Sequence, residues 1–191
     1  MMRLLAQILF TLCAVSVAVR ARADDTPAKQ LRWVVEAKHS EVQFRLRALG
    51  VIGIEGSMVN VQGEIWRDAH GRWVQLRVPL QQLQMSNEDN RKWALSPEFF
   101  DAARHPLLIF TAALPDDERV PEGALDGVLQ LRGIAAPVRV QILPRRCTDT
   151  ASACEVLADS EVSRRRFGMR TRRYVVSDKV MLKLSLRLTK Q

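Results

Sequence analysis

The sequence predicts an all-β protein, a sandwich or barrel of strands, and three observations lead to this prediction. Apolar and polar residues alternate with a period of two in segments along most of the chain. Turn-forming residues separate these segments at intervals of about ten residues, which is typical of sandwiches and barrels rather than of α/β proteins. Helical signals are confined to one stretch, residues 86–104.

The first 23 residues have the order of features that marks a secretory signal peptide. Arg3 gives a positive start, residues 4–19 are mostly apolar, and Ala21-Arg22-Ala23 provides a small-x-small cleavage site. A retained anchor is the alternative, but an apolar run of about 16 residues is shorter than the roughly 20 that span a bilayer. We therefore expect a cleaved signal and a periplasmic protein.

The remaining residues, 24–191, have the length of one domain. They include 26 of the 29 lysines and arginines and all 21 acidic residues, so the basic excess is moderate. A domain of this length encloses a large core without a structural metal.

Four segments predict strands with one dry and one wet face. In "EVQFRLR", residues 41–47, Val42 and Phe44 alternate with polar residues, and the same pattern occurs at 74–80, 138–142 and 180–188. Residues 67–72 and 132–137 each lie between two strand candidates and predict hairpin turns, whereas residues 115–127 predict a polar loop.

The stretch "LSPEFFDAARHPLLIF" predicts a short helix that leads into a strand. Ser96 suits the N-cap and Pro97 the first helical position, so the helix would cover residues 97–104 and end before Pro106. A second short turn is expected from Ser86. Adjacent on this helix, Phe99 and Phe100 are expected to close one end of the apolar interior.

Chemistry-bearing residues are sparse. The histidines His39, His70 and His105 do not stand at metal-ligand spacing, and no nucleophile motif is present, so we expect neither a metal nor an enzyme. In an exported chain, Cys147 and Cys154 predict a disulfide that closes a short loop; a zinc pair is the weaker alternative because no third ligand lies near.

Basic residues cluster in "RRRFGMRTRR", residues 164–173. A solvated loop, contact of Arg164, Arg165 and Arg166 with anionic lipid head groups, and nucleic-acid binding all fit such a cluster. Export of the chain argues against nucleic acid.

Several motifs together resemble the YceI-like family. They are "KHSEVQFRLRALGVIGIEGSM", "SPEFFDAARHPLLIF", "GVLQLRGIAAPVRVQI" and "FGMRTRRYVVSDKVMLKLSLRL", which span residues 31–188 in the family's order. One segment differs: the family commonly has Arg-Asp-x-His-Leu before the Ser-x-x-Phe-Phe-Asp motif, and this chain has Asn-Arg-Lys-Trp-Ala at 90–94.

The resemblance implies an antiparallel, lipocalin-like β-barrel that holds an isoprenoid or an isoprenoid quinone in an apolar pore and needs no cofactor. Residues implied at the ligand by their match to the family motifs, together with Trp93 beside them, are His39, Val42, Phe44, Trp93, Phe99, Phe100 and Phe110. The sequence leaves open an alternative, a filled barrel that acts as an interaction module in the cell envelope. It also leaves open whether the protein forms a homodimer.

Overall fold

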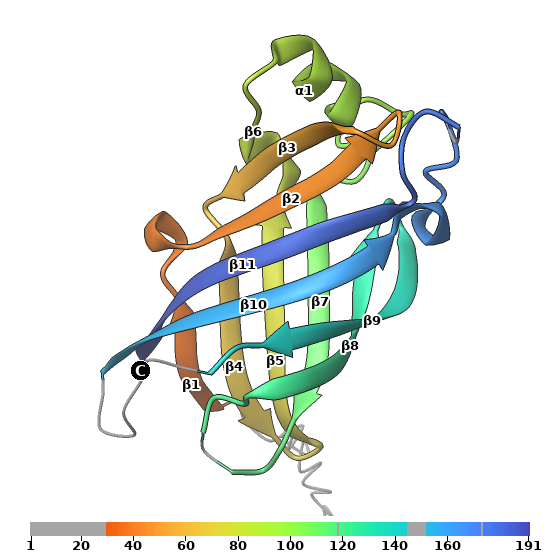
Figure 1. Ribbon diagram of the computed structural model, residues 1–191. Helices are drawn as coiled ribbons and strands as arrows, with labels where there is room; N and C mark the ends of the chain where they lie inside the picture. The colour runs from red at the N-terminus through yellow and green to blue at the C-terminus, as the bar shows by residue number, and fades with distance from the viewer. Residues whose placement is uncertain (1–29, 118, 145–151, 173) are drawn as a thin grey trace, which may run out of the picture.

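The structure is a computed structural model that describes residues 30–117, 119–144, 152–172 and 174–191. These residues form eleven strands, one α-helix and three short 3-10 helices (Figure 1). The strands are β1 (Gln30–Val35), β2 (Glu41–Ala48), β3 (Ile52–Val59), β4 (Gln62–Asp68), β5 (Gly71–Pro79), β6 (Leu83–Gln84), β7 (Leu107–Leu114), β8 (Gly123–Leu131), β9 (Ile134–Ile142), β10 (Ala153–Ser163) and β11 (Lys179–Lys190). The helices are α1 (Glu88–Leu95), η1 (Ala37–His39), η2 (Leu80–Gln82) and η3 (Arg164–Phe167).

Eight strands close into an antiparallel barrel in the order β1-β4-β5-β7-β8-β9-β10-β11, and β1 pairs with β11 to complete the ring. The predicted all-β, lipocalin-like barrel is thus confirmed. In the described part of the chain, no helix is long and apolar enough to cross a membrane.

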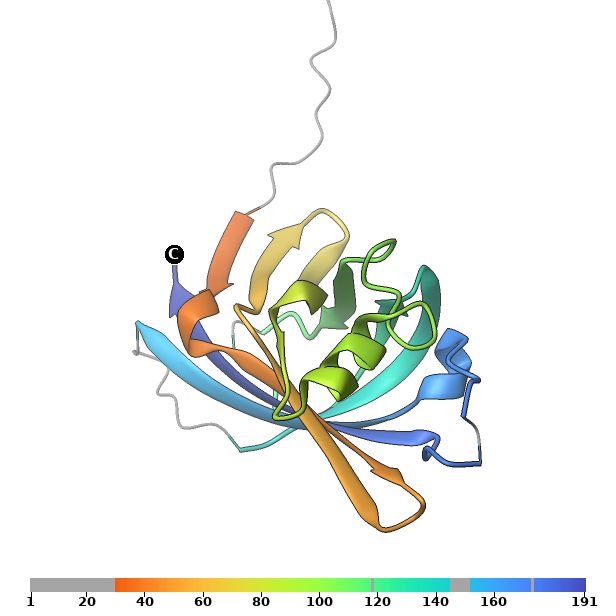
Figure 2. The same ribbon diagram turned by 90° about the horizontal axis from the view of Figure 1, so that it is seen from above.

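The long strand β11 is shared by two partners on one edge. Its first half pairs with β2, from Met181↔Arg45 to Ser185↔Glu41, and its last residues pair with β1. Because η1 interrupts the chain between β1 and β2, the sheet β2-β3-β6 leaves the wall of the barrel and extends past its end. Seen from above, α1 and the turns that follow it cover this end of the barrel (Figure 2).

Buried and exposed residues alternate along the strands with the predicted period of two. In β2, Val42, Phe44 and Leu46 are buried and the residues between them are exposed or half-buried. β5, β9 and β11 coincide with the other three predicted strands. The inward faces form one hydrophobic core that runs through the barrel.

Two glycines on the inward face make room for aromatic rings. A Cβ at Gly56 would lie 2.7 Å from the Phe44 ring, and a Cβ at Gly127 would lie 2.5 Å from the Phe110 ring. Both rings therefore lie flat over a neighbouring strand, in space that any other residue would fill.

The predicted helix at 97–104 is wrong in position. The helix lies one segment earlier, at Glu88–Leu95, where the Asn87 side chain accepts a hydrogen bond from the Asn90 N–H as N-cap. Residues 97–104 form turns instead, because Phe100 N–H bonds back to Ala94 O and Asp101 takes a left-handed φ of 51°. The broader prediction of helical structure within 86–104 holds.

Both predicted hairpins are confirmed, with turns between β4 and β5 and between β8 and β9. The predicted loop 115–127 is too long, since β8 already begins at Gly123.

Candidate functional site

An apolar cavity lies inside the barrel, under α1 and the segment 96–105, which together we call the cap. About 30 Å³ of it is open to the centre of a water molecule. Eleven apolar side chains and one arginine line it: Phe44, Met58, Phe99, Phe100, Leu108, Leu129, Leu131, Val162, Arg164, Met169, Val180 and Leu182. The wall therefore offers almost no polar partner to water.

Aromatic rings in edge-to-face contact separate the cavity from solvent. The Phe100 ring lies 6.0 Å from that of Phe44 and 4.7 Å from that of Phe99. On the outer side Trp93 of α1 packs on Phe99 at 4.9 Å. Adjacent residues on a regular helix would point about 100° apart. The turn at 97–101 instead brings both phenylalanines to the cavity.

Polar bonds hold the cap together and join it to the rest of the barrel, and they lie at Pro97, Glu98 and Phe99. The Trp93 indole N–H donates to the Glu98 carboxylate at 2.9 Å, and Arg172 lies 3.6 Å from the same carboxylate. Thr171 Oγ1 donates to the Glu98 carbonyl at 3.1 Å. From the β8–β9 turn, Arg132 donates to the carbonyls of Pro97 and Phe99.

Arg164 is the one charged residue in the cavity wall, and its side chain is only 1% exposed. It donates four hydrogen bonds to the carbonyls of Met169, Thr171, Val176 and Ser177. Burial lowers the pKa of Arg164, and the nearby Asp178 partly opposes that effect. A guanidinium still stays protonated at any pH a folded protein meets, so a fixed positive charge lies behind the cavity wall, although the surface that faces the cavity is apolar.

Asp178 ties the basic loop to the barrel. Burial raises the pKa of this carboxyl, but hydrogen bonds from Arg165, Ser163 and a backbone N–H outweigh burial, and the pKa is lowered from its usual value. Asp178 is therefore ionised wherever the protein is folded near neutral pH.

Asp101 is buried in the cap, and sequence reasoning did not single it out. Its Oδ1 atom has no hydrogen-bond partner within the described structure, and its left-handed φ is costly for a residue other than glycine. Next to Phe100 the cap therefore contains a residue, Asp101, that combines an unpaired buried oxygen with a strained backbone.

The seven residues that the resemblance implied do not form one cluster. Phe44, Phe99 and Phe100 line the cavity, and Trp93 packs behind Phe99. Val42 and Phe110 are buried in the core but do not border the cavity.

His39 lies outside the barrel, between β1 and β2. Its side chain is 64% exposed and pairs with Glu36 at 3.0 Å. Contact of these seven residues with a ligand stays a prediction.

The predicted lipid contact of Arg164 is wrong, because that side chain is buried and its bonds are made inside the protein. Every second residue of β10 faces inward, and position 164 continues this alternation on the inward side. Arg165 and Arg166 are exposed. Cys154 is buried and disulfide-bonded. Cys147 lies outside the described residues, so its pairing with Cys154 stays a prediction.

The described residues contain no group of three or more histidine, cysteine or carboxylate side chains that would hold a metal ion.

A model of the YceI-like domain matches residues 33–188. The chain belongs to the YceI-like family.

Solved structures of YceI-like fold resemble this barrel at low sequence identity. A polyisoprenoid-binding domain from Saccharophagus degradans superposes with a TM-score of 0.64 at 13% identity, over 85% of this chain and 100% of that one. BcnA from Burkholderia cenocepacia gives 0.63 at 16%, over 80% and 98%. The YceI protein of Campylobacter jejuni gives 0.59 at 14%, over 76% and 89%. No curated protein matches the sequence significantly.

Proposed function

We propose that this YceI-like protein binds a long apolar molecule, an isoprenoid or an isoprenoid quinone, inside the barrel beneath the cap, and that it catalyses no reaction. The observation that carries the proposal is the apolar cavity closed by Phe99 and Phe100. The description of the Saccharophagus degradans relative as polyisoprenoid-binding supports the ligand class.

The cap has to move for such a ligand to enter. A cavity with about 30 Å³ open to water centres holds two or three waters at ~10–15 Å³ each, far less than a chain of isoprene units. The wall around the cavity is a closed ring of hydrogen-bonded strands, whereas the cap is held by turns and side-chain bonds. The ligand therefore replaces the two phenylalanine rings as the filling of this end of the barrel.

The energy balance sets a minimum chain length. Exposing two phenylalanines costs ~3–6 kcal/mol, and the three hydrogen bonds and one ion pair from Thr171, Arg132 and Arg172 add ~2–5 kcal/mol. Burial of one isoprene unit, at ~0.8 kcal/mol per carbon group, returns ~3–4 kcal/mol. About three units are needed before binding outweighs opening.

The head group is expected to accept a hydrogen bond. Arg164 lines the cavity through apolar surface, and one hydrogen on its Nη2, behind that surface, has no acceptor within the described structure, so opening of the cap would have to bring the ligand to it. A quinone carbonyl would meet this need, and a saturated hydrocarbon would not.

The cellular setting follows from the leader. We infer that residues 1–23 are removed as a signal peptide and that the domain 24–191 acts in the periplasm. Arg165 and Arg166 of the basic loop would contact anionic lipid head groups there.

The alternative is a filled barrel that serves as an interaction module, and the small volume of the cavity favours it. Under that alternative no isoprenoid is retained at any length.

A chain-length series distinguishes the two functions. We expect isoprenoid alcohols with three or more units to bind the purified mature domain, measured by equilibrium dialysis, and those with two units not to bind. Phe100→Ala removes one ring of the plug, so we expect it to bind the two-unit compound. Phe110→Ala is the matched control, because Phe110 is equally buried but does not line this cavity.

Phe100→Ala and Phe110→Ala each remove one phenylalanine ring from the core, so they lose similar core volume. Equal thermal stability of the two variants shows that their binding can be compared. Wild type and Phe100→Ala that stay folded and bind no isoprenoid of any length would leave only the alternative. Mass spectrometry of lipids extracted from protein purified under native-like expression then identifies the ligand itself.

A further inference from the structure

The tip of the β2–β3 hairpin exposes apolar side chains outside the barrel. Pairing of β2 with β11 ends at Arg45, but the hairpin continues to Ala48 and Ile52. Beyond that point Leu49 is 63%, Val51 84% and Ile52 53% exposed. The hairpin projects past the barrel wall in the view from above (Figure 2). Three neighbouring apolar side chains at a projecting tip form an exposed patch. Such a patch marks an interaction site, whereas apolar residues scattered singly over a surface do not.

The turn itself does not require an apolar residue. Leu49 and Gly50 have φ values of 50° and 75°, which define a two-residue turn with both central residues left-handed. Such turns favour Asn-Gly or Asp-Gly, and a leucine is disfavoured there. A leucine that is strained and mostly exposed contributes nothing to the core, so its role lies outside the fold.

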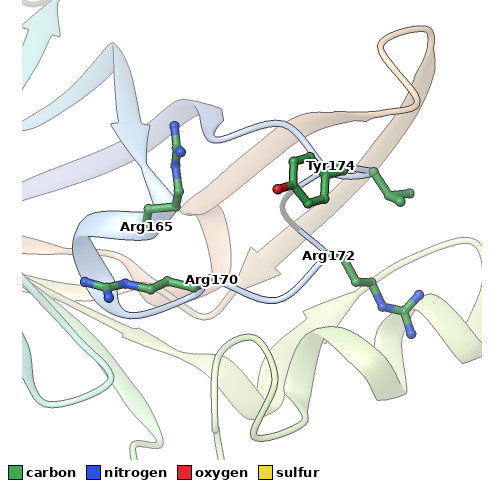
Figure 3. Close-up of a pocket in the computed structure, with 5 residues that line it drawn as sticks. Arg165, Arg170, Arg172 and Tyr174 are labelled. Carbon is green, nitrogen blue, oxygen red and sulfur yellow. The ribbon is translucent and has the colours of Figure 1, made fainter.

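A basic loop flanks the tip and extends its surface. Leu49 N–H bonds to Val175 O at 2.7 Å, which fixes Tyr174 and Val175 beside the hairpin. Tyr174 is 84% exposed. With Arg165, Arg170 and Arg172 these two residues line a surface pocket of about 560 Å³ (Figure 3).

The charge of this surface is strongly positive. The described part of this loop exposes four arginines, Arg165, Arg166, Arg170 and Arg172, and its one acidic residue in the sequence 164–178 is Asp178. Asp178 is bound to Arg165, and Arg172 pairs with Glu98 at 3.6 Å and lies over the Trp93 ring at 5.2 Å, whereas Arg170 has no ion pair in the described structure. An apolar tip, an exposed tyrosine and surrounding arginines form the combination that suits a bilayer interface with anionic lipids.

We propose that the hairpin tip and the basic loop form a membrane-docking surface. Leu49, Val51 and Ile52 insert between lipids, Tyr174 lies at the level of the head groups, and the exposed Arg165 and Arg170 contact anionic head groups. The proposal extends the lipid contact of the proposed function, but docking needs no ligand in the barrel.

The test uses the mature domain and vesicles without any isoprenoid. We expect it to co-sediment with vesicles of phosphatidylcholine containing about 30 mol% phosphatidylglycerol, and to bind pure phosphatidylcholine at least tenfold more weakly. Raising sodium chloride from about 25 to about 500 mM should release most of the protein, because it screens the arginines.

Variants separate the two parts of the surface. Leu49→Asn should weaken binding at least fivefold without loss of stability, since asparagine suits the turn. Arg170→Gln should weaken binding about fivefold, the equivalent of ~1 kcal/mol per cationic residue near an anionic surface. Val128→Asn is the control, because Val128 is exposed on β8 and lies on the barrel wall.

Three results would overturn the proposal: no binding to anionic vesicles at low salt, equal binding to both vesicle types, or unchanged binding by Leu49→Asn. The first would assign the tip to a protein partner. Inorganic phosphate that displaces the protein more than sodium chloride of equal ionic strength would assign the arginines of the loop to a free anion. Failure of isoprenoid binding with intact docking would reject only the proposed function.

Discussion

Gly56→Ala and Gly127→Ala test whether the space beside Phe44 belongs to the ligand site. At Gly56 the new methyl would lie 2.7 and 2.9 Å from two atoms of the Phe44 ring and 2.8 Å from Met85 Cγ. The Phe44 ring has to move by roughly half an ångström or more to reach ordinary contact distance. Its far side borders the cavity, so the ring can move there.

At Gly127 the neighbouring Phe110 ring cannot move toward this cavity. Its methyl would lie 2.5 Å from two atoms of the Phe110 ring and 2.8 Å from the Thr111 carbonyl, and that carbonyl belongs to the ladder between β7 and β8. Phe110 does not line the cavity beneath the cap. Overpacking costs ~1–3 kcal/mol, and we expect Gly56→Ala at the low end and Gly127→Ala at the high end or above.

Two measurements check this pair. Since ~1 kcal/mol lowers Tm by ~2–4 °C in a domain of this size, we expect a loss of about 3 °C for Gly56→Ala and about 8 °C or more for Gly127→Ala. Isoprenoid binding should fall at least fivefold in Gly56→Ala, whose cavity shrinks, and stay unchanged in folded Gly127→Ala. The reverse order in either measurement would refute the assignment of the cavity.

Three further predictions concern stability. Arg164→Leu leaves four carbonyls without their donor, so we expect the free energy of unfolding in urea to fall by ~3 kcal/mol or more. The control Arg166→Leu, at an exposed position, should change it by less than ~0.5 kcal/mol. Because the pKa of Asp178 is lowered on folding, its contribution is complete above the unfolded pKa of ~3.9 and is lost as pH falls below it; Asp178→Asn should flatten thermal stability over that acid range, and an unchanged slope would contradict the assigned bonds. Cys147→Ser should remove ~2.5 kcal/mol if Cys147 closes a short loop with Cys154, and a reducing agent should then have no further effect on the variant's Tm.

Local patterns in the sequence predict the barrel well, because each strand and hairpin depends on near neighbours. The alternation at 180–188 continues through β11, and the β8–β9 turn falls on Arg132 and Gly133, whose φ values are both left-handed. Period-two burial and turn chemistry decide such elements without reference to the rest of the chain.

The cap could not be predicted in the same way. Ser96 and Pro97 have the pattern of a helix start, but the segment after α1 folds back on it, with bonds from Phe100 N–H to Ala94 O and, after the left-handed Asp101, from Ala102 N–H to Leu95 O. The sharing of β11 by β1 and β2 is also a long-range property.

Arg164 is different, since the sequence did contain the signal. Val156, Ala158, Ser160 and Val162 face inward along β10, and position 164 continues that parity. A basic residue at an inward position predicts an internal bonding role rather than a surface one.

The position of the docking surface relative to the cap matters for an insoluble ligand. One loop bonds to both, because Val175 O accepts from Leu49 at the hairpin and Thr171 donates to Glu98 in the cap. The side of the cap that is held by this loop is therefore the side next to the proposed membrane contact. A ligand that leaves there meets lipid instead of water, and each isoprene unit avoids an exposure cost of ~3–4 kcal/mol. For a chain of three units that difference exceeds the cost of opening the cap, so release toward the membrane is feasible where release into water is not.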